Sequence, residues 1–386
     1  MLDIKAKNGA KEMKKISLLV SILMAFVLLI SSCGTKSNET TAKELEAKDL
    51  EIEEVENKDT KNDNSETEDV EMETENAETE DEETEADNVE TEDIETESDN
   101  RIEAYSGSDK PTITGTTTFV ADIVKVLAED FVNIDMIIPA GDDPHLYEPK
   151  PQDLQKITDA DLVIYHGLHF EGKMVDVLEN YGHALAKDFP ADRVGAMDQD
   201  GDLIIDPHFW FDLELYKLAV NNTADYLSQL LPDAADTIAK NTEEYNEQLV
   251  VLFEESKEKL DSIPEDSRYL ITPHDAFNYF SRSFDIPVMA PQGISTDSEV
   301  ANKDIQNTVD FIVEKEIKAV FAETTTDPAR MEKLKEAAAA QGFDVKVVSG
   351  EGQELFSDSL APEGQPGDNF IDMFTHNVDL IVENLK

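Results

Sequence analysis

Residues 233–263 read DAADTIAKNTEEYNEQLVVLFEESKEKLDSI, a run without Gly or Pro that lies between Pro232 and Pro264. Apolar residues recur in it at helical spacing, at positions 238, 245, 249, 252, 260 and 263. We therefore predict a single helix of about 31 residues, roughly 46 Å long at 1.5 Å per residue.

Short apolar runs alternate with amphipathic stretches on both sides of this helix, which is typical of α/β proteins with parallel sheets. Before it we expect strands at 112–119, 134–138 and 162–165, and helices at 120–129, 152–158, 172–180 and 212–230. After it we expect strands at 269–272, 287–290, 319–323 and 345–348, and helices at 276–283, 303–315, 328–341 and 369–385. The predicted fold class is α/β, with two similar lobes built on central parallel sheets, joined by one long rigid helix, and a ligand site in the cleft between them.

The composition excludes several classes of function. The chain has 386 residues, with 87 Asp and Glu against 32 Lys and Arg, and a formal net charge of −55. Such a charge repels a polyanion, so a nucleic-acid partner is excluded. The single cysteine, Cys33, excludes a disulfide framework and every zinc or iron–sulfur site that needs several cysteines.

The N-terminus indicates export. A basic segment that contains Lys14 and Lys15 precedes an apolar run over 16–30, too short for a membrane span, and Ser31-Ser32-Cys33 follows. We predict a lipoprotein signal peptide over 1–32 and a lipid anchor on Cys33, where acyl chains would hold the protein to the membrane. The alternative is an ordinary cleavable signal with an unrelated cysteine nearby.

An acidic stretch follows the signal. Residues 41–100 hold 28 Asp and Glu against four Lys, and no aromatic residue occurs between 34 and 100. Such a segment buries too little apolar surface to fold, and its like charges extend it. We interpret 33–108 as a disordered tether; a weak collector of divalent cations is the alternative.

Three histidines occupy similar places. His145, His208 and His274 each follow a proline, and each lies in a connection that leads from a strand or loop toward a helix, where binding residues concentrate. Each alone reads more simply as a structural residue, but together they favour a shared cation site. Asp358 follows the last predicted strand and fits as a fourth ligand. Three imidazoles and one carboxylate suit four-coordinate Zn²⁺, and a bidentate carboxylate gives the five-coordination that Mn²⁺ tolerates.

Several ordered motifs over residues 111–386 resemble one family, the TroA-like zinc/manganese solute-binding lipoproteins of bacterial metal ABC transporters (cluster A-I). The resemblance rests on these motifs: Asp143-Pro144-His145 with Tyr147-Glu148-Pro149, Asp206-Pro207-His208 with Trp210, His274-Asp275-Ala276-Phe277, Gly293-Ile294-Ser295-Thr296, Phe356-Ser357-Asp358 and Thr375-His376-Asn377.

The resemblance implies that His145, His208, His274 and Asp358 hold the metal, two ligands from each lobe. It implies an N-terminal lobe over 109–231, a linking helix over 232–263 that limits lobe movement, and a C-terminal lobe over 264–386. The protein would be an extracytoplasmic monomer, lipid-anchored to the bacterial cell membrane, that delivers Mn²⁺ or Zn²⁺ to an ABC permease.

Two departures bear on the cargo. Zinc-dedicated members usually carry a His-rich loop between the first two ligand motifs, whereas residues 184–207 contain no histidine. Some manganese-dedicated members have Glu at the third ligand position, where this chain has His274. The missing loop favours manganese slightly, and ligand softness favours zinc.

The other candidates carry weaker arguments. His166 and His169 are spaced as a pair that could bind a second metal. Glu323 either supports the metal site or caps its strand. Trp210 is expected to pack beside the site. We expect His183 and His376 to be surface or packing residues. A metalloenzyme is disfavoured, because four protein ligands close the coordination shell and no catalytic motif occurs. A surface adhesin with a structural metal is the alternative function.

Overall fold

The computed structural model describes residues 101–199 and 201–386. The predicted signal peptide, Cys33 and the acidic stretch to residue 100 lie outside these residues. The strands are β1 Thr112–Gly115, β2 Asn133–Met136, β3 Leu162–Tyr165, β4 His183–Ala184, β5 Ala196–Gln199, β6 Asp202–Ile205, β7 Leu270–Ile271, β8 Val288–Met289, β9 Ala319–Phe321 and β10 Lys346–Val348. The helices are α2 Thr118–Ala128, α3 Pro151–Asp159, α4 Val175–Tyr181, α5 Leu213–Leu230, α6 Ala235–Asp261, α7 Asn278–Phe284, α8 Asn302–Glu314, α9 Ala329–Ala340 and α10 Phe370–Leu385.

The first lobe is built on a parallel sheet with the strand order β2-β1-β3-β4. Strand β1 is shorter than the predicted 112–119. It ends at Gly115 because Thr117 caps α2: its Oγ1 accepts the Val120 N–H at 3.4 Å, and this turns the chain into the helix.

The second lobe contains the parallel pairs β7–β8 and β9–β10. All four strands are shorter than predicted. Isolated parallel bridges join His274 to Gln292 and Glu323 to Leu355, just beyond the ends of these strands. The backbone around two of the singled-out residues is therefore held at one edge of the sheet, where the strands end.

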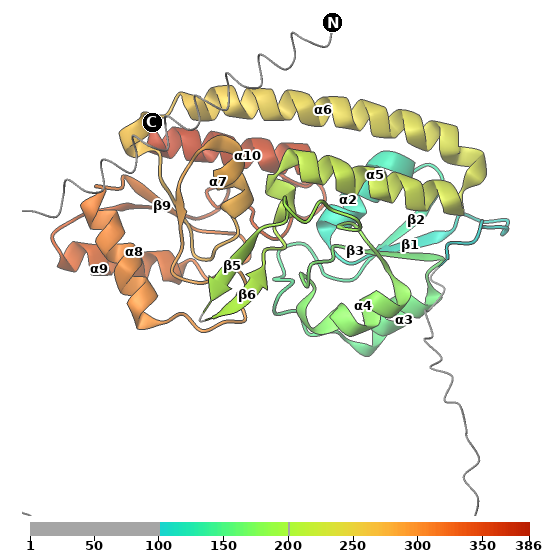
Figure 1. Cartoon of the computed structure of the whole chain (residues 1–386), viewed down its shortest axis with the longest axis horizontal. Helices are drawn as coiled ribbons and strands as arrows, with labels where there is room; N and C mark the ends of the chain where they lie inside the picture. The colour runs from blue at the N-terminus through green and yellow to red at the C-terminus, as the bar shows by residue number, and fades with distance from the viewer. Residues whose placement is uncertain (1–100, 200) are drawn as a thin grey trace, which may run out of the picture. The chain divides into compact units, whose positions relative to one another are not determined.

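Helix α6 lies along both lobes (Figure 1). It has 27 residues, fewer than predicted, because the 3₁₀ turn Pro232–Ala234 replaces its predicted start and it ends at Asp261, before the predicted end at 263. At 1.5 Å per residue it is roughly 40 Å long. The Asn241 side chain donates to the Leu127 carbonyl in the first lobe, and Lys259 pairs with Asp379 on α10 at 2.5 Å. The helix is therefore attached to both lobes.

Aromatic side chains form a continuous core across the two lobes. Phe119 stacks on Trp210 with centroids 4.8 Å apart, and Phe211 stacks on Phe277 of α7 at 4.5 Å. These rings belong to one buried cluster that includes residues of both lobes. Sliding the lobes apart would expose this surface, which favours small movements.

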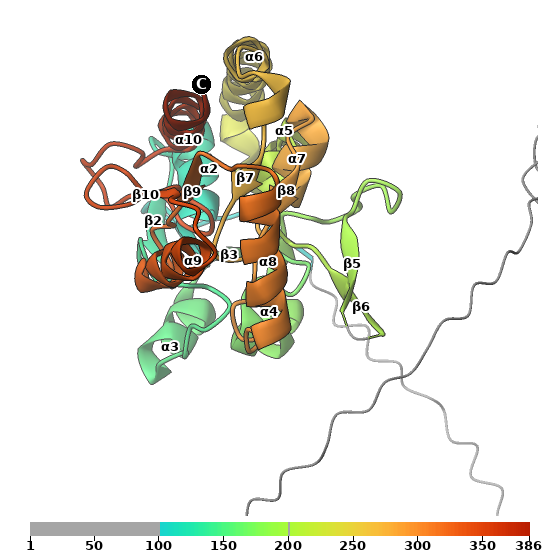
Figure 2. The same cartoon turned by 90° about the vertical axis from the view of Figure 1, so that its left-hand side faces the viewer.

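The sequence patterns did not predict the two-residue strand β4 or the antiparallel hairpin of β5 and β6. The hairpin stands away from the helices around it (Figure 2). The residues between its strands are Asp200-Gly201, a pair common in two-residue hairpin turns. Leu203 is 73% exposed on it. The segment that the resemblance singled out for lacking a His-rich loop therefore contains this hairpin.

Two further features concern the edges of the described part. The Tyr105 N–H donates to the Leu230 carbonyl at 2.8 Å, so the packed region includes residues before β1. Within 101–199 and 201–386, every helix is too short or too polar to cross a membrane.

Candidate metal centre

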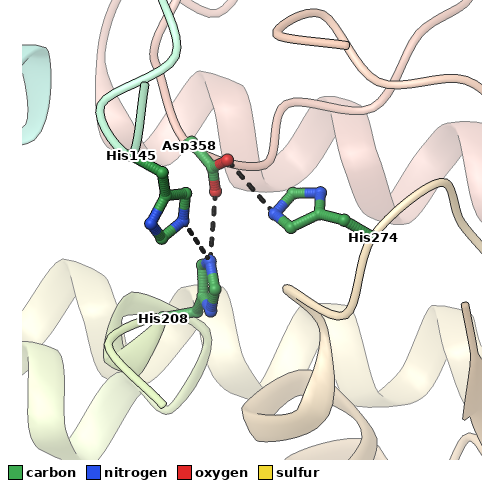
Figure 3. Close-up of side chains that lie close together, drawn as sticks. All are labelled: His145, His208, His274 and Asp358. Atoms are coloured by element: carbon green, nitrogen blue, oxygen red, sulfur yellow. Dashed lines mark hydrogen bonds and ion pairs between the residues drawn. The ribbon is translucent and has the colours of Figure 1, made fainter. Parts of the chain in front are cut away.

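The four singled-out side chains meet between the lobes (Figure 3). His145 and His208 come from the first lobe, in loops after β2 and β6, and His274 and Asp358 come from the second, in loops after β7 and β10. His145 Nε2 lies 3.3 Å from His208 Nε2, which lies 3.4 Å from Asp358 Oδ1. Asp358 Oδ2 lies 3.2 Å from His274 Nε2.

One atom from each of the four residues lies within 4.8 Å of the others, a spacing compatible with ligands of a single ion. His208, His274 and Asp358 are fully buried, and His145 is 6% exposed. His274 Nε2 and both oxygens of Asp358 are buried without a hydrogen-bond partner. Buried polar atoms are rarely left this way, and a divalent cation would satisfy all three. The residues therefore fit a metal.

Two carboxylates orient the rings of His208 and His274 through Nδ1, on the side of each ring away from the candidate ligand atom Nε2. His208 Nδ1 donates to Asp206 Oδ1 at 2.7 Å, and His274 Nδ1 donates to Glu323 Oε2 at 2.5 Å. A proton on Nδ1 leaves the Nε2 lone pair free for a cation. Glu323, for which the sequence left two roles open, thus contacts the site directly. The role of Asp206 was missed, although its place two residues before a candidate ligand was a signal.

The two Asp-Pro-His turns share one local geometry. Asp143 Oδ1 accepts the backbone N–H of His145 at 2.9 Å, and Asp206 Oδ1 accepts the backbone N–H of His208 at 3.0 Å. Aspartate readily makes this turn with the residue two positions on. The same local sequence therefore places both histidines of the first lobe.

Gly172 supports the His145 loop from outside. It has φ +47°, and a Cβ there would lie 2.6 Å from the His145 carbonyl oxygen. Only glycine allows this backbone approach without displacing the loop.

Burial and the acidic partners separate the pKa values of the histidines. Burial lowers the pKa of His145 to about 3, so this ring is neutral. Burial also opposes a charge on His208, but Asp206 and Asp358 outweigh it and raise the pKa to about 9. The pKa of His274 is raised well above its usual value, because Glu323 and Asp358 outweigh burial. Burial opposes a charge on Asp358 too, yet His274 and His208 hold its pKa well below its usual range. Protons thus occupy the site when metal does not.

Aromatic rings enclose the site. Trp210 packs against His208 with centroids 5.2 Å apart, which confirms the expectation that it lies beside the site. Phe170 meets His145 edge to face at 5.1 Å. These rings exclude water, and exclusion strengthens electrostatic contacts inside the site.

The remaining histidines lie elsewhere. His166 is buried among Phe119, Phe170, Phe209 and Trp210, whereas His169 is exposed. In the described part of the chain the pair belongs to no group of three or more potential ligands. His183 is half-buried against Tyr226, and His376 lies 3.0 Å from the Glu354 carbonyl.

The model of the family described as "Zinc-uptake complex component A periplasmic" matches residues 113–384. The chain is 35% identical over 286 residues to the manganese-binding lipoprotein MntA of Bacillus subtilis, which covers 73% of this chain and 92% of MntA. It is 34% identical over 281 residues to the zinc-binding protein TroA of Treponema pallidum, covering 72% and 89%.

Solved structures agree with this fold. A TroA structure from work on metal-binding specificity is 56% identical, with a TM-score of 0.71, and the match covers 72% of this chain and all of that one. The periplasmic zinc-binding protein TroA of Treponema pallidum matches with a TM-score of 0.67 at 33% identity, covering 72% and 99%. The predicted fold class, two α/β lobes with a long linking helix, is confirmed. From the match over residues 113–384 and these relatives, the chain belongs to the family of zinc-uptake complex component A, the TroA-like metal-binding proteins.

Proposed function

We propose that this protein captures one divalent transition metal ion, Mn²⁺ or Zn²⁺, outside the cytoplasm and delivers it to an ABC permease for import. The observation that carries the proposal is the buried quartet of His145, His208, His274 and Asp358, whose Nε2 and carboxylate atoms converge without other partners. The names of MntA and TroA, a manganese-binding and a zinc-binding protein, support both cargoes. None of the relatives reported above is named as an adhesin.

The donor set admits both metals. Three imidazole nitrogens and one carboxylate oxygen complete a tetrahedral shell for Zn²⁺, and a carboxylate that binds through both oxygens raises the coordination to five for Mn²⁺. Both Asp358 oxygens face histidine Nε2 atoms, so either binding mode lies within reach. The absence of histidine from 184–207 is the argument for manganese, and ligand softness is the argument for zinc.

The protein would work as a carrier. Four protein ligands leave no open position on a tetrahedral ion for a reacting water, which argues against a metalloenzyme. Because each lobe supplies two of the four ligands, a small separation of the lobes would remove half of the metal's coordination shell. A permease that binds the separated state more tightly would thereby favour release.

The organisation of the whole chain belongs to the same proposal. A signal over 1–32, acylation of Cys33 and a tether that starts at residue 33 and ends before the packed Tyr105 would hold the carrier at the membrane, with lobes over 109–231 and 264–386 joined by the linker over 232–263. Residues 1–100 lie outside the described structure, so the lipid anchor is tested by mass spectrometry of the protein purified from membranes.

Calorimetric titration of the metal-stripped protein with Mn²⁺ and with Zn²⁺ tests the site. We expect one equivalent of each metal to bind, and His145→Ala to abolish tight binding. Leu203→Ala, on the exposed hairpin, is the control that should bind as the unchanged protein does. If neither metal binds, the ligand assignment is wrong.

A further inference from the structure

Both Asp-Pro-His turns reach across to the second lobe through their aspartates. Asp143 Oδ1 holds the His145 N–H, and Asp143 Oδ2 accepts the Thr296 hydroxyl at 2.6 Å. Asp206 Oδ1 holds His208, and Asp206 Oδ2 accepts the Asn278 amide at 3.1 Å. Each carboxylate thus has one oxygen on a candidate ligand of its own lobe and the other on the opposite lobe.

The donors in the second lobe are themselves held in place. The Thr296 backbone carbonyl accepts the Gln292 side-chain N–H at 2.8 Å, and Gln292 Oε1 accepts an N–H of Arg330. Asn278 is the first residue of α7. Its neighbour Tyr279 donates to the Asp206 carbonyl and accepts the Gly195 N–H, both at 2.8 Å. Movement of the second lobe is therefore transmitted to the two aspartates.

We propose that Asp143 and Asp206 are positioning residues that couple closure of the lobes to retention of the metal, through Thr296 and Asn278. With the lobes closed, the donors of the second lobe fix the aspartates, and these fix the His145 and His208 turns. As the lobes part, both contacts break together with the metal shell. The inference rests on the proposed function, because it presumes that the quartet binds metal.

The coupling predicts a particular kinetic signature. Hydrogen bonds that exist only in the closed state stabilise it, so their loss speeds opening and metal release. Association begins from the open state, where these contacts are absent, and its rate should not change. A general loosening of the binding loops would slow association as well, because the ligands would no longer be prearranged.

Thr296→Val tests the coupling, because valine keeps the shape of threonine and removes the hydroxyl. Ser283→Ala is the matched control: its hydroxyl also crosses between the lobes, to the Phe211 carbonyl at 3.3 Å, but touches neither Asp-Pro-His turn. The protein is loaded with Zn²⁺ and mixed with an excess of a chromogenic chelator, whose absorbance reports the released metal. The association rate is measured separately.

We expect Thr296→Val to speed release about tenfold, since a hydrogen bond to a charged group is worth about one factor of ten or more. Association should change less than about twofold, and Asn278→Ala should act in the same direction. The proposal would be overturned if Thr296→Val and Ser283→Ala released the metal at equal rates. It would also be overturned if slower association, and not faster release, explained the lower affinity of Thr296→Val. Equilibrium titration of the unchanged protein distinguishes failure of this inference from failure of the proposed function. If the unchanged protein binds no metal, the proposed function itself fails.

Discussion

Glu323 Oε2 lies 2.5 Å from His274 Nδ1, and the same oxygen accepts the Ser357 hydroxyl at 3.1 Å. One carboxylate therefore orients a candidate ligand and also ties β9 to the loop that carries Asp358. Through this acid, two ligands of the second lobe form one unit.

Replacing Glu323 should weaken metal binding without removing a ligand. We expect Glu323→Gln to lower the affinity for Zn²⁺ roughly 10- to 100-fold, because the amide no longer holds His274 Nδ1 as a charged acceptor does. Competition titration with a chelator of known affinity measures the change. Glu243→Gln, at an exposed acid on α6 that is distant in sequence from all four candidate ligands, is the control; equal losses in both variants would contradict a specific role for Glu323.

Metal binding should displace protons. Because the pKa of His208 is about 9 and that of His274 is also raised, both rings are protonated at pH 7 in the metal-free protein, whereas His145 is neutral. We expect about two protons to leave per metal bound, and the affinity to rise with pH from 7 toward 9, the pKa of His208. Calorimetry in buffers of different ionisation enthalpy counts the protons.

Asp206→Asn provides the control for that count. It removes a charge that raises the pKa of His208, so the release should fall toward one proton. A count of zero in the unchanged protein would show that the two rings are neutral before metal binds.

The pH dependence of folding should report Asp122. Burial raises its pKa to about 6, although its Oδ2 accepts the Phe370 N–H at the start of α10 at 3.1 Å. The folded-state pKa exceeds the unfolded value of 3.8, so this contribution to stability is full below pH 3.8 and is lost as the pH rises through 6. The loss amounts to about 3 kcal/mol for a shift of two pKa units.

Urea unfolding of the metal-free protein at pH 4 and pH 7 checks this contribution. Asp122→Asn keeps an acceptor for Phe370 and cannot ionise, so its free energy of unfolding should change less between the two pH values. An unchanged difference would place the pH dependence on other groups.

Gly172→Ala should displace the first ligand loop. The new Cβ would lie 2.6 Å from the His145 carbonyl oxygen, and the loop must shift to accommodate it. We expect metal affinity to fall at least tenfold, whereas Gly350→Ala, with φ +101° and open space around it, should strain the backbone alone. Titration and thermal unfolding together separate these effects; equal affinities would refute the argument from close approach.

The sequence predicted the elements with long periodic patterns and the residues with distinctive chemistry. The apolar spacing over 233–263 predicted α6. The proline before each of three histidines indicated a shared site, and their side chains lie together in the structure. Their local roles follow from short-range chemistry that a single sequence displays.

Contacts across long sequence separations escaped prediction. Thr296 lies 153 residues from Asp143, and Asn278 lies 72 from Asp206, so no spacing rule connects them. The β5–β6 hairpin was not predicted because its strands, Ala196–Gln199 and Asp202–Ile205, are four residues long and lack a regular polar–apolar alternation. The Asp200-Gly201 pair between them was the available signal. The start of α6 depended on the turn at Pro232, and the end of β1 depended on the cap at Thr117.

The hairpin has a consequence for how such a carrier can evolve. Its base adjoins Asp206 and His208, whereas its strands lead away from the helices (Figure 2), and Leu203 on β6 is largely exposed. Exposed tips tolerate insertions, because few buried contacts depend on them. A lineage can therefore lengthen the tip of the hairpin with metal-gathering residues, or shorten it, while the ligand geometry at the base is inherited intact. Gathering and holding the ion are then separable traits, open to selection one at a time.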